Sequence, residues 1–347
     1  MRRGWLEAAV LLTAIVLVFF GCANKWITSG KIAMNGKDYD KAIEDFNKAL
    51  DQNPESGEAH YYLAECYKEK GEYRKMLPHL DAAEKLYPKK ADKIGDLRKE
   101  TWNVLFDSGK QNAKDKKWED AKSDFEMAVK VFPERFETFT NLGYVWQHLG
   151  DNDSAYYYYS IAYEMAPDEI AVLENFANLC FSIGRNDKAK ELYQKLLEKD
   201  PNDAEAMEML GQIYDMEGDF QEAVNYYGRA LDIASDNCYI WLNLGIIYFR
   251  QFQDTLNTNT TYSDSAINAY SRALELCPDD SNAFNNLAVA YIASKKYDEA
   301  VDILSTYVED HPDFCKAWDL YSRALLLKGL KSQALEAYKK YEECTGK

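Results

Sequence analysis

The fold is decided by one stretch of sequence, FETFTNLGYVWQHLGDNDSAYYYYSIAYEMAPDE, at residues 136–169. Apolar residues recur in each half of it at intervals of three and four, which predicts two amphipathic helices. Gly150 separates the halves and Pro167 follows the second one, and both residue types end helices. A single helix pair of this kind cannot bury its own apolar face, so we expect it to stack on copies of itself.

Copies of this stretch fill the rest of the chain. A small residue returns at the eighth position of every copy, and alanine returns at the twentieth position of eight of the nine. Small residues at these positions allow two antiparallel helices to approach closely. The nine copies span 23–56, 57–90, 102–135, 136–169, 170–203, 204–237, 238–280, 281–314 and 315–347, with inserts near 91–101 and 253–263.

The recurring pattern has an aromatic residue at position 4, Leu-Gly at 7 and 8, Tyr at 11, Ala at 20, Phe or Tyr at 24 and Pro at 32. This pattern resembles the tetratricopeptide repeat. The resemblance implies an all-α fold, a solenoid in which antiparallel helix pairs wind into a right-handed superhelix. It also implies that the first helices of the pairs form a concave wall on which other proteins bind.

Three segments depart from the regular pattern. In copy 2, Met76 replaces alanine and Pro78 lies inside the second helix, which predicts a kink or a late helix start. The insert 91–101 is charged and compatible with a helix, so we expect it to lengthen the first helix of copy 3. The insert 253–263 is rich in Thr and Asn, and we expect an exposed loop there.

The N-terminal residues have the pattern of a secretory signal. Two arginines precede an apolar run of 13 residues, which is too short to span a bilayer core of ~30 Å. The run ends in Phe-Phe-Gly-Cys at 19–22, which resembles the lipobox of bacterial lipoproteins. The resemblance implies a signal peptide at 1–21, a diacylated Cys22, and a lipid anchor in the cell envelope, in the outer membrane facing the periplasm. An uncleaved signal anchor and cleavage at another site are the alternatives.

Composition and motifs exclude several classes of function. The net charge of −17 argues against a nucleic-acid partner, because phosphate binding needs a basic face. The sequence contains no Walker loop, no Gly-x-Gly-x-x-Gly and no His-x-x-x-His motif. His60 occupies an aromatic position of the repeat, which favours a role in the core. We therefore expect no catalytic residue, no metal site and no cofactor.

Six cysteines follow Cys22, and they allow fifteen full pairings. Cys238 and Cys315 stand at position 1 of their copies, and Cys277 and Cys344 stand at positions 31 and 30 of the same copies. In an antiparallel pair the residue opposite position 1 is near position 27. The partners are then ~5–6 Å apart along the axis, which is marginal for a disulfide. Cys238–Cys277 and Cys315–Cys344 are candidate disulfides, and free thiols are the alternative.

The partner-binding residues are expected on the concave wall, at positions 2, 5, 6, 9, 12 and 13 of the first helices of copies 4–8. Copies 4–6 offer acidic and aromatic side chains, copies 7 and 8 apolar ones. Asparagine at position 6 resembles the asparagine ladder of O-linked N-acetylglucosamine transferases, which holds an extended peptide through side-chain amides; alternatively, asparagine is merely common there. The candidates are Asn141, Tyr144, Asn175, Asn178, Phe181, Tyr239, Leu242, Asn243, Ile246, Phe249, Asn286, Val289 and Ile292.

These observations favour a non-catalytic, membrane-tethered scaffold that binds a protein or peptide segment in cell-envelope assembly. We expect the segment to be extended or helical, basic at one end and apolar at the other. The architecture is similar to that of tetratricopeptide lipoproteins that help to assemble outer-membrane proteins, pili or the cell wall. The alternative is an adaptor or regulatory subunit of an envelope hydrolase or protease. A cytosol-facing cochaperone would need the uncleaved anchor, and usually a basic clamp where copies 4–6 carry glutamates.

Overall fold

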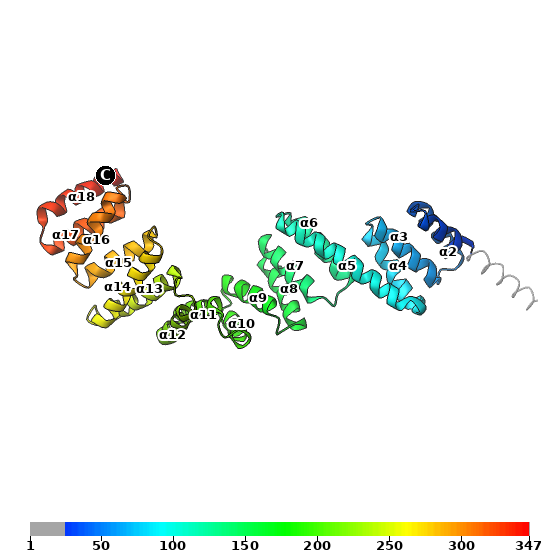
Figure 1. Ribbon diagram of the computed structural model, residues 1–347, viewed down its shortest axis with the longest axis horizontal. Coiled ribbons are helices and arrows are strands. Elements are labelled where there is room, and N and C mark those ends of the chain that lie inside the picture. Colours follow the sequence, from blue (N-terminus) through cyan, green and yellow to red (C-terminus); the bar gives the residue numbers. More distant parts are fainter. Residues whose placement is uncertain (1–24, 347) are drawn as a thin grey trace, which may run out of the picture. The chain divides into compact units, whose positions relative to one another are not determined.

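The computed structural model describes residues 25–346, and every regular element among them is a helix (Figure 1). Contacts divide the chain into two compact units, unit 1 (Met1–Ile183) and unit 2 (Gly184–Lys347), which are described in turn. No helix in the described part is both long enough and apolar enough to cross a membrane. The all-α fold expected from the sequence is confirmed.

Unit 1 is a row of antiparallel helix pairs in which α3 packs on α4, α5 on α6 and α7 on α8. Ahead of them, a helical segment at 25–35 packs against α2 through Ile27 and Phe46. The first helices of successive pairs also contact one another, α3 with α5, α5 with α7 and α7 with α9. The helices are α2 (Tyr39–Gln52), α3 (Gly57–Glu69), α4 (Tyr73–Leu86), the short 3-10 helix η1 (Pro88–Lys90), α5 (Ala91–Lys114), α6 (Trp118–Val131), α7 (Phe136–His148), α8 (Asn152–Met165) and α9 (Ile170–Ser182).

Unit 2 continues the same arrangement, with α11 on α12, α13 on α14, α15 on α16 and α17 on α18. Here too the first helices of successive pairs meet, α13 with α15 and α15 with α17. The helices are α10 (Asn186–Lys199), α11 (Ala204–Glu217), α12 (Phe220–Ile233), α13 (Cys238–Asp254), α14 (Thr260–Leu276), α15 (Ser281–Ala293), α16 (Tyr297–Asp310), α17 (Cys315–Lys328) and α18 (Lys331–Thr345).

One contact recurs inside the helix pairs of both units. A glycine at the eighth repeat position of the first helix lies against the aromatic ring at position 24 of the second helix. A Cβ atom at Gly143 would lie 2.8 Å from the ring of Tyr159, and one at Gly211 would lie 3.0 Å from the ring of Tyr227. Both rings are buried. The interior is too densely packed to absorb such overlaps, so the small residue sets the helix separation, as the sequence predicts.

The turn between the two helices of a copy holds the residue at position 15 in the left-handed region. Gly218 has φ +81° there, a conformation that glycine adopts without steric cost. In three copies a lysine takes its place, Lys37 at φ +60° and Lys116 and Lys295 at φ +59°. Each lysine costs about 1 kcal/mol relative to an unstrained residue.

The two irregular segments, Pro78 in copy 2 and the insert before copy 3, both lie within helices. The second helix of copy 2, α4, begins at Tyr73, the repeat position at which α2 begins, so Pro78 does not delay its start. The insert 91–101 extends α5 to 24 residues, which confirms the expected longer helix. Its side chains Ile94 and Leu97 are buried in the same core cluster as Met76, so the added turns contribute apolar packing.

The prediction of an exposed loop at 253–263 is wrong for more than half of these residues. Helix α13 continues to Asp254 and α14 begins at Thr260, which leaves only residues 255–259 as the connection. Phe252 and Ser263 at the ends of the two helices are buried, the first beside Phe249. These buried residues stabilise the extra turns, a contribution that the polar composition of the insert does not reveal.

The structure joins Cys238 to Cys277 and Cys315 to Cys344, with Cα–Cα separations of 6.1 and 5.5 Å. Each bond connects the first residue of a first helix with the end of the following second helix. The bonds close loops with sequence separations of 39 and 29 residues. A disulfide that closes a loop of this length stabilises the folded state by roughly 3–4 kcal/mol, because it restricts the unfolded chain. Cys66 and Cys180 are buried thiols.

Two alanine substitutions in unit 1 should have opposite effects on stability. Gly143→Ala should lower the free energy of unfolding by about 1–3 kcal/mol, because the new Cβ would displace the buried ring of Tyr159. Gly95→Ala in α5 should raise it by roughly 0.5–1 kcal/mol, because no atom lies near its Cβ position and alanine favours a helix. Urea denaturation followed by circular dichroism measures both. Equal effects of the two changes would contradict the packing described.

Candidate partner-binding site

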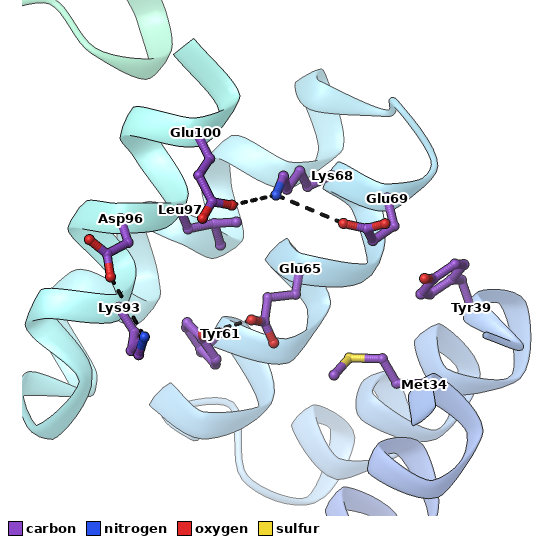
Figure 2. Close-up of a pocket in the computed structure, with 10 residues that line it drawn as sticks. All are labelled: Met34, Tyr39, Tyr61, Glu65, Lys68, Glu69, Lys93, Asp96, Leu97 and Glu100. Atoms are coloured by element: carbon purple, nitrogen blue, oxygen red, sulfur yellow. Dashed lines mark hydrogen bonds and ion pairs between the residues drawn. The ribbon is translucent and has the colours of Figure 1, made fainter. Parts of the chain in front are cut away.

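The first helices of unit 1 enclose a pocket of about 320 Å³ (Figure 2). Helix α3 contributes residues at repeat positions 5, 9, 12 and 13, four of the positions expected to face a partner. The helical segment 25–35, the start of α2 and the extended N-terminal part of α5 complete the pocket. The lining residues are Met34, Tyr39, Tyr61, Glu65, Lys68, Glu69, Lys93, Asp96, Leu97 and Glu100.

Polar side chains in this pocket are ordered by four contacts. The hydroxyl of Tyr61 donates a hydrogen bond of 2.7 Å to Oε1 of Glu65, one helical turn along α3. Nζ of Lys68 donates to Glu100 of α5 at 2.7 Å and lies 3.8 Å from Glu69 (Figure 2). Within α5, Lys93 lies 3.7 Å from Asp96, which is a looser, solvent-exposed pair.

The pocket carries more negative than positive charge, and its carboxylates differ in their partners. Burial raises the pKa of Glu65, although the hydrogen bond from Tyr61 and the charge of Lys68 oppose that shift. The hydrogen bond and charge of Lys68 lower the pKa of Glu100. The thiol of Cys66 is wholly buried, and burial followed by the charges of Glu65 and Glu69 raises its pKa to about 12. Cys66 is therefore not a nucleophile at neutral pH.

The partner-binding residues predicted from the sequence all lie in copies 4–8, so they include none of the residues that line this pocket. A usable signal was present: Tyr61, Glu65 and Lys68 occupy the same repeat positions as the candidates, in copy 2. What the sequence did not show is that the insert 91–101 continues α5 so that Leu97 and Glu100 complete the pocket.

The candidates of unit 1 lie on the first helices but differ in their availability. The amides of Asn141 and Asn175 donate to backbone carbonyls of their own helices, at 2.7 and 2.6 Å. Each of these two amides therefore has one of its two N–H donors engaged within its own helix, which the sequence did not reveal. Tyr144 is 40% exposed. Asn178 is also exposed on α9, and Phe181 is half-buried.

An aromatic cluster surrounds Tyr144. The ring of His148 lies 4.4 Å from that of Tyr144 and 4.3 Å from that of Trp118, measured between centroids. Tyr144 and His148 hold repeat positions 9 and 13, the positions of Glu65 and Glu69 in copy 2. The same wall of unit 1 therefore presents carboxylates in one copy and aromatic rings in another.

The apolar patch expected in copies 7 and 8 of unit 2 is smaller than the sequence indicates. Tyr239 and Ile246 are 64% and 37% exposed. Leu242 and Phe249 instead pack on the core around Tyr270. The remaining apolar candidates, Val289 and Ile292, likewise pack on the core around Phe284, and Asn243 and Asn286 are half-buried.

The acidic side chains of copy 6 are largely satisfied inside unit 2. Arg250 donates two hydrogen bonds to the carboxylate of Asp215, at 2.9 and 3.0 Å. Glu208 accepts from the amide of Gln212 at 3.2 Å, while burial raises its pKa. The acidic character expected of this wall is therefore weaker than its composition indicates.

Family profiles of the tetratricopeptide repeat match residues 33–92, 175–238 and 263–324, which together make up more than half of the chain. The chain belongs to the tetratricopeptide repeat family. No curated protein sequence matches it. A solved tetratricopeptide repeat protein from Parabacteroides merdae is 19% identical, with 71% of this chain and 93% of that one covered and a TM-score of 0.51, a likeness of fold alone.

Two further structures are similar over shorter parts of the chain. MamA from Desulfovibrio magneticus is 15% identical, with 52% of this chain and 97% of that one covered and a TM-score of 0.47. YrrB, described as a tetratricopeptide protein with an unusual peptide-binding site, is 22% identical, with 57% and 96% covered and a TM-score of 0.38.

A pair of histidines forms a polar contact between the two helices of copy 2, α3 and α4. Nδ1 of His60 lies 2.9 Å from Nδ1 of His79, and Nε2 of His60 lies 3.1 Å from the carbonyl of Pro54. Because a carbonyl only accepts, the neutral His60 carries its proton on Nε2 and accepts from Nδ1–H of His79. No group of three or more metal-ligating side chains occurs in residues 25–346.

This pair should make the tetratricopeptide array sensitive to acid. Burial, and then the charge of His60, lower the pKa of His79 from 6.5 to about 4. Between pH 6.5 and 4 the side chain of His79 binds a proton in the unfolded chain but not in the folded one. The free energy of unfolding is therefore highest above pH 6.5 and decreases as the pH falls towards 4. We expect a loss of about 1–2 kcal/mol, reduced by partial solvent exposure.

Urea denaturation at several pH values measures this loss. His79→Gln keeps a donor for His60 but does not titrate, so its stability should vary less between pH 6.5 and 4 than that of the unaltered protein. An unchanged pH profile in the variant would contradict the assignment.

Proposed function

We propose that the protein is a scaffold anchored to a bacterial envelope membrane through Cys22, and that it binds a segment of another protein on its first-helix wall. The observation that carries the proposal is the pocket of unit 1, which is built from repeat positions 5, 9, 12 and 13 and left open by the packing of the core. The family is generally non-catalytic, and its arrays are suited to binding proteins or peptides.

The bonded cysteines support the proposal that the protein is located in an oxidising compartment. Cys238–Cys277 and Cys315–Cys344 are bonded pairs, and disulfides persist in the periplasm but rarely in the cytosol. Cys22 lies outside the described residues. The chain is already helical at Lys25, the first described residue, so a lipid on Cys22 would hold the first repeat close to the membrane surface. Two acyl chains are needed for stable anchoring, and diacylation supplies them.

The anchor is tested by substituting the proposed lipid attachment residue. Cells that express the protein and are fed labelled palmitate should incorporate label into it, and Cys22→Ala should abolish both the label and membrane fractionation. Cys66→Ala is a matched control because Cys66 is a buried thiol and cannot be acylated in the folded chain. Label that persists in Cys22→Ala would overturn the anchor.

The binding wall is tested by photocrosslinking in intact envelopes. A benzophenone amino acid at Tyr144 should capture a discrete partner, because this side chain is 40% exposed on a first helix. The same replacement at Tyr157, which is 59% exposed on the second helix of the same copy, should capture far less. Equal capture at both positions would show that the first-helix wall is not the preferred surface.

A further inference from the structure

The pocket of unit 1 contains one carboxylate without a cationic partner in the described chain. Lys68 forms ion pairs with Glu69 and Glu100, and Lys93 forms one with Asp96. Glu65 accepts a hydrogen bond from the hydroxyl of Tyr61, on Oε1, and forms no ion pair; the charges of Lys68 and Lys90 act on it only from a longer distance. A half-buried carboxylate held in this way is costly for the folded chain unless a positive charge approaches it.

The size and lining of the pocket fit a long side chain. About 320 Å³ is at the lower end of the range for small-molecule sites, which suits one side chain rather than a helix. Met34, Tyr39 and Leu97 supply apolar and aromatic surface around the carboxylates (Figure 2). The aliphatic stem of lysine or arginine packs on such surface while its charged end reaches a carboxylate.

Charge further along unit 1 favours the same kind of ligand. No Lys or Arg occurs between Arg135 and Arg185, while this stretch contains seven acidic residues. Trp118 of copy 3 forms an aromatic cluster with the exposed Tyr144 and His148 of copy 4, at positions that correspond to those of Tyr39, Glu65 and Glu69 in copies 1 and 2. A basic segment would therefore meet no repelling side chain from this part of the chain and would find ring faces that attract cations.

We propose that this pocket takes the side chain of an arginine or lysine from an extended segment of a partner protein, with Glu65 as its counter-ion and Tyr61 as a positioning residue. The proposal rests on the proposed function, since it assigns chemistry to one part of the binding wall. Raised by burial, the pKa of Glu65 should fall when a cation binds, so binding should strengthen as the pH rises through that pKa.

A phage-displayed library of random peptides, selected on the full-length protein in detergent, tests this assignment. Selected peptides should share a basic residue at one aligned position, and replacing it with glutamine should weaken binding of the synthetic peptide about tenfold, measured by fluorescence anisotropy. Glu65→Gln should cause a similar loss. Glu164→Gln, the same charge change on an exposed second helix of unit 1, should cause none. Thermal melts establish that each variant is folded.

The pH profile separates positioning from a merely structural effect. In the unaltered protein, affinity for the basic peptide should rise with pH and then level off. Glu65→Gln should make the profile flat. Tyr61→Phe should move its midpoint to higher pH, because the carboxylate loses the hydrogen bond that favours its charged form.

Different outcomes overturn different claims. Peptides selected without a shared basic residue, or an unchanged affinity in Glu65→Gln, would overturn the cation pocket while leaving protein binding intact. Competition by free spermidine as strong as that by the peptide itself would overturn its assignment to a protein segment. Failure to select any peptide, together with equal crosslinking at Tyr144 and Tyr157, would overturn the proposed function as well.

Discussion

The structure depends on one contact, the aromatic ring of a second helix pressed against a glycine of the first. At Gly143 and Gly211 the ring occupies the space that a Cβ would fill, so the helix separation is fixed by the smallest residue available. The same contact recurs in copies 1, 3, 4, 6 and 7, in both units, and it fixes how closely the two helices of each of these pairs approach one another. Repetition of that geometry produces the walls on which the candidate sites lie.

This constraint leaves some side chains free to vary. The ring and the small residues face the interior of the pair. Positions 5, 9, 12 and 13 lie on the first-helix wall and range from exposed side chains such as Tyr144 to Phe249, which packs on the core, and Tyr61, which is buried in it. In unit 1 these positions become a charged pocket in copy 2 and an aromatic cluster around Tyr144 in copy 4. The repeat therefore separates stability from surface chemistry, and two copies with the same fold present different side chains.

The sequence predicted the helix pairs because its signals are local and repeated. It failed where side chains from separate segments decide the outcome. The polar insert 253–263 hides the burial of Phe252 and Ser263, and Phe249 appeared to be a surface residue but packs on the core around Tyr270. The lysines with positive φ, such as Lys116, lack the glycine that usually marks this turn. The pocket itself required knowing that α5 extends beside α3, which no single repeat specifies.

The distribution of partners among the acidic side chains, rather than the net charge, distinguishes the candidate site. The chain has a charge of −17, yet most of its acidic side chains reveal nothing about a ligand. Asp215 is neutralised by Arg250, and Glu208 accepts hydrogen bonds from neutral amides. Glu65 is half-buried with a single neutral donor and no cation, although Lys68 lies one turn away and bonds to Glu100 instead. An acidic surface attracts many cations weakly, whereas one desolvated carboxylate in a pocket selects a cation that fits.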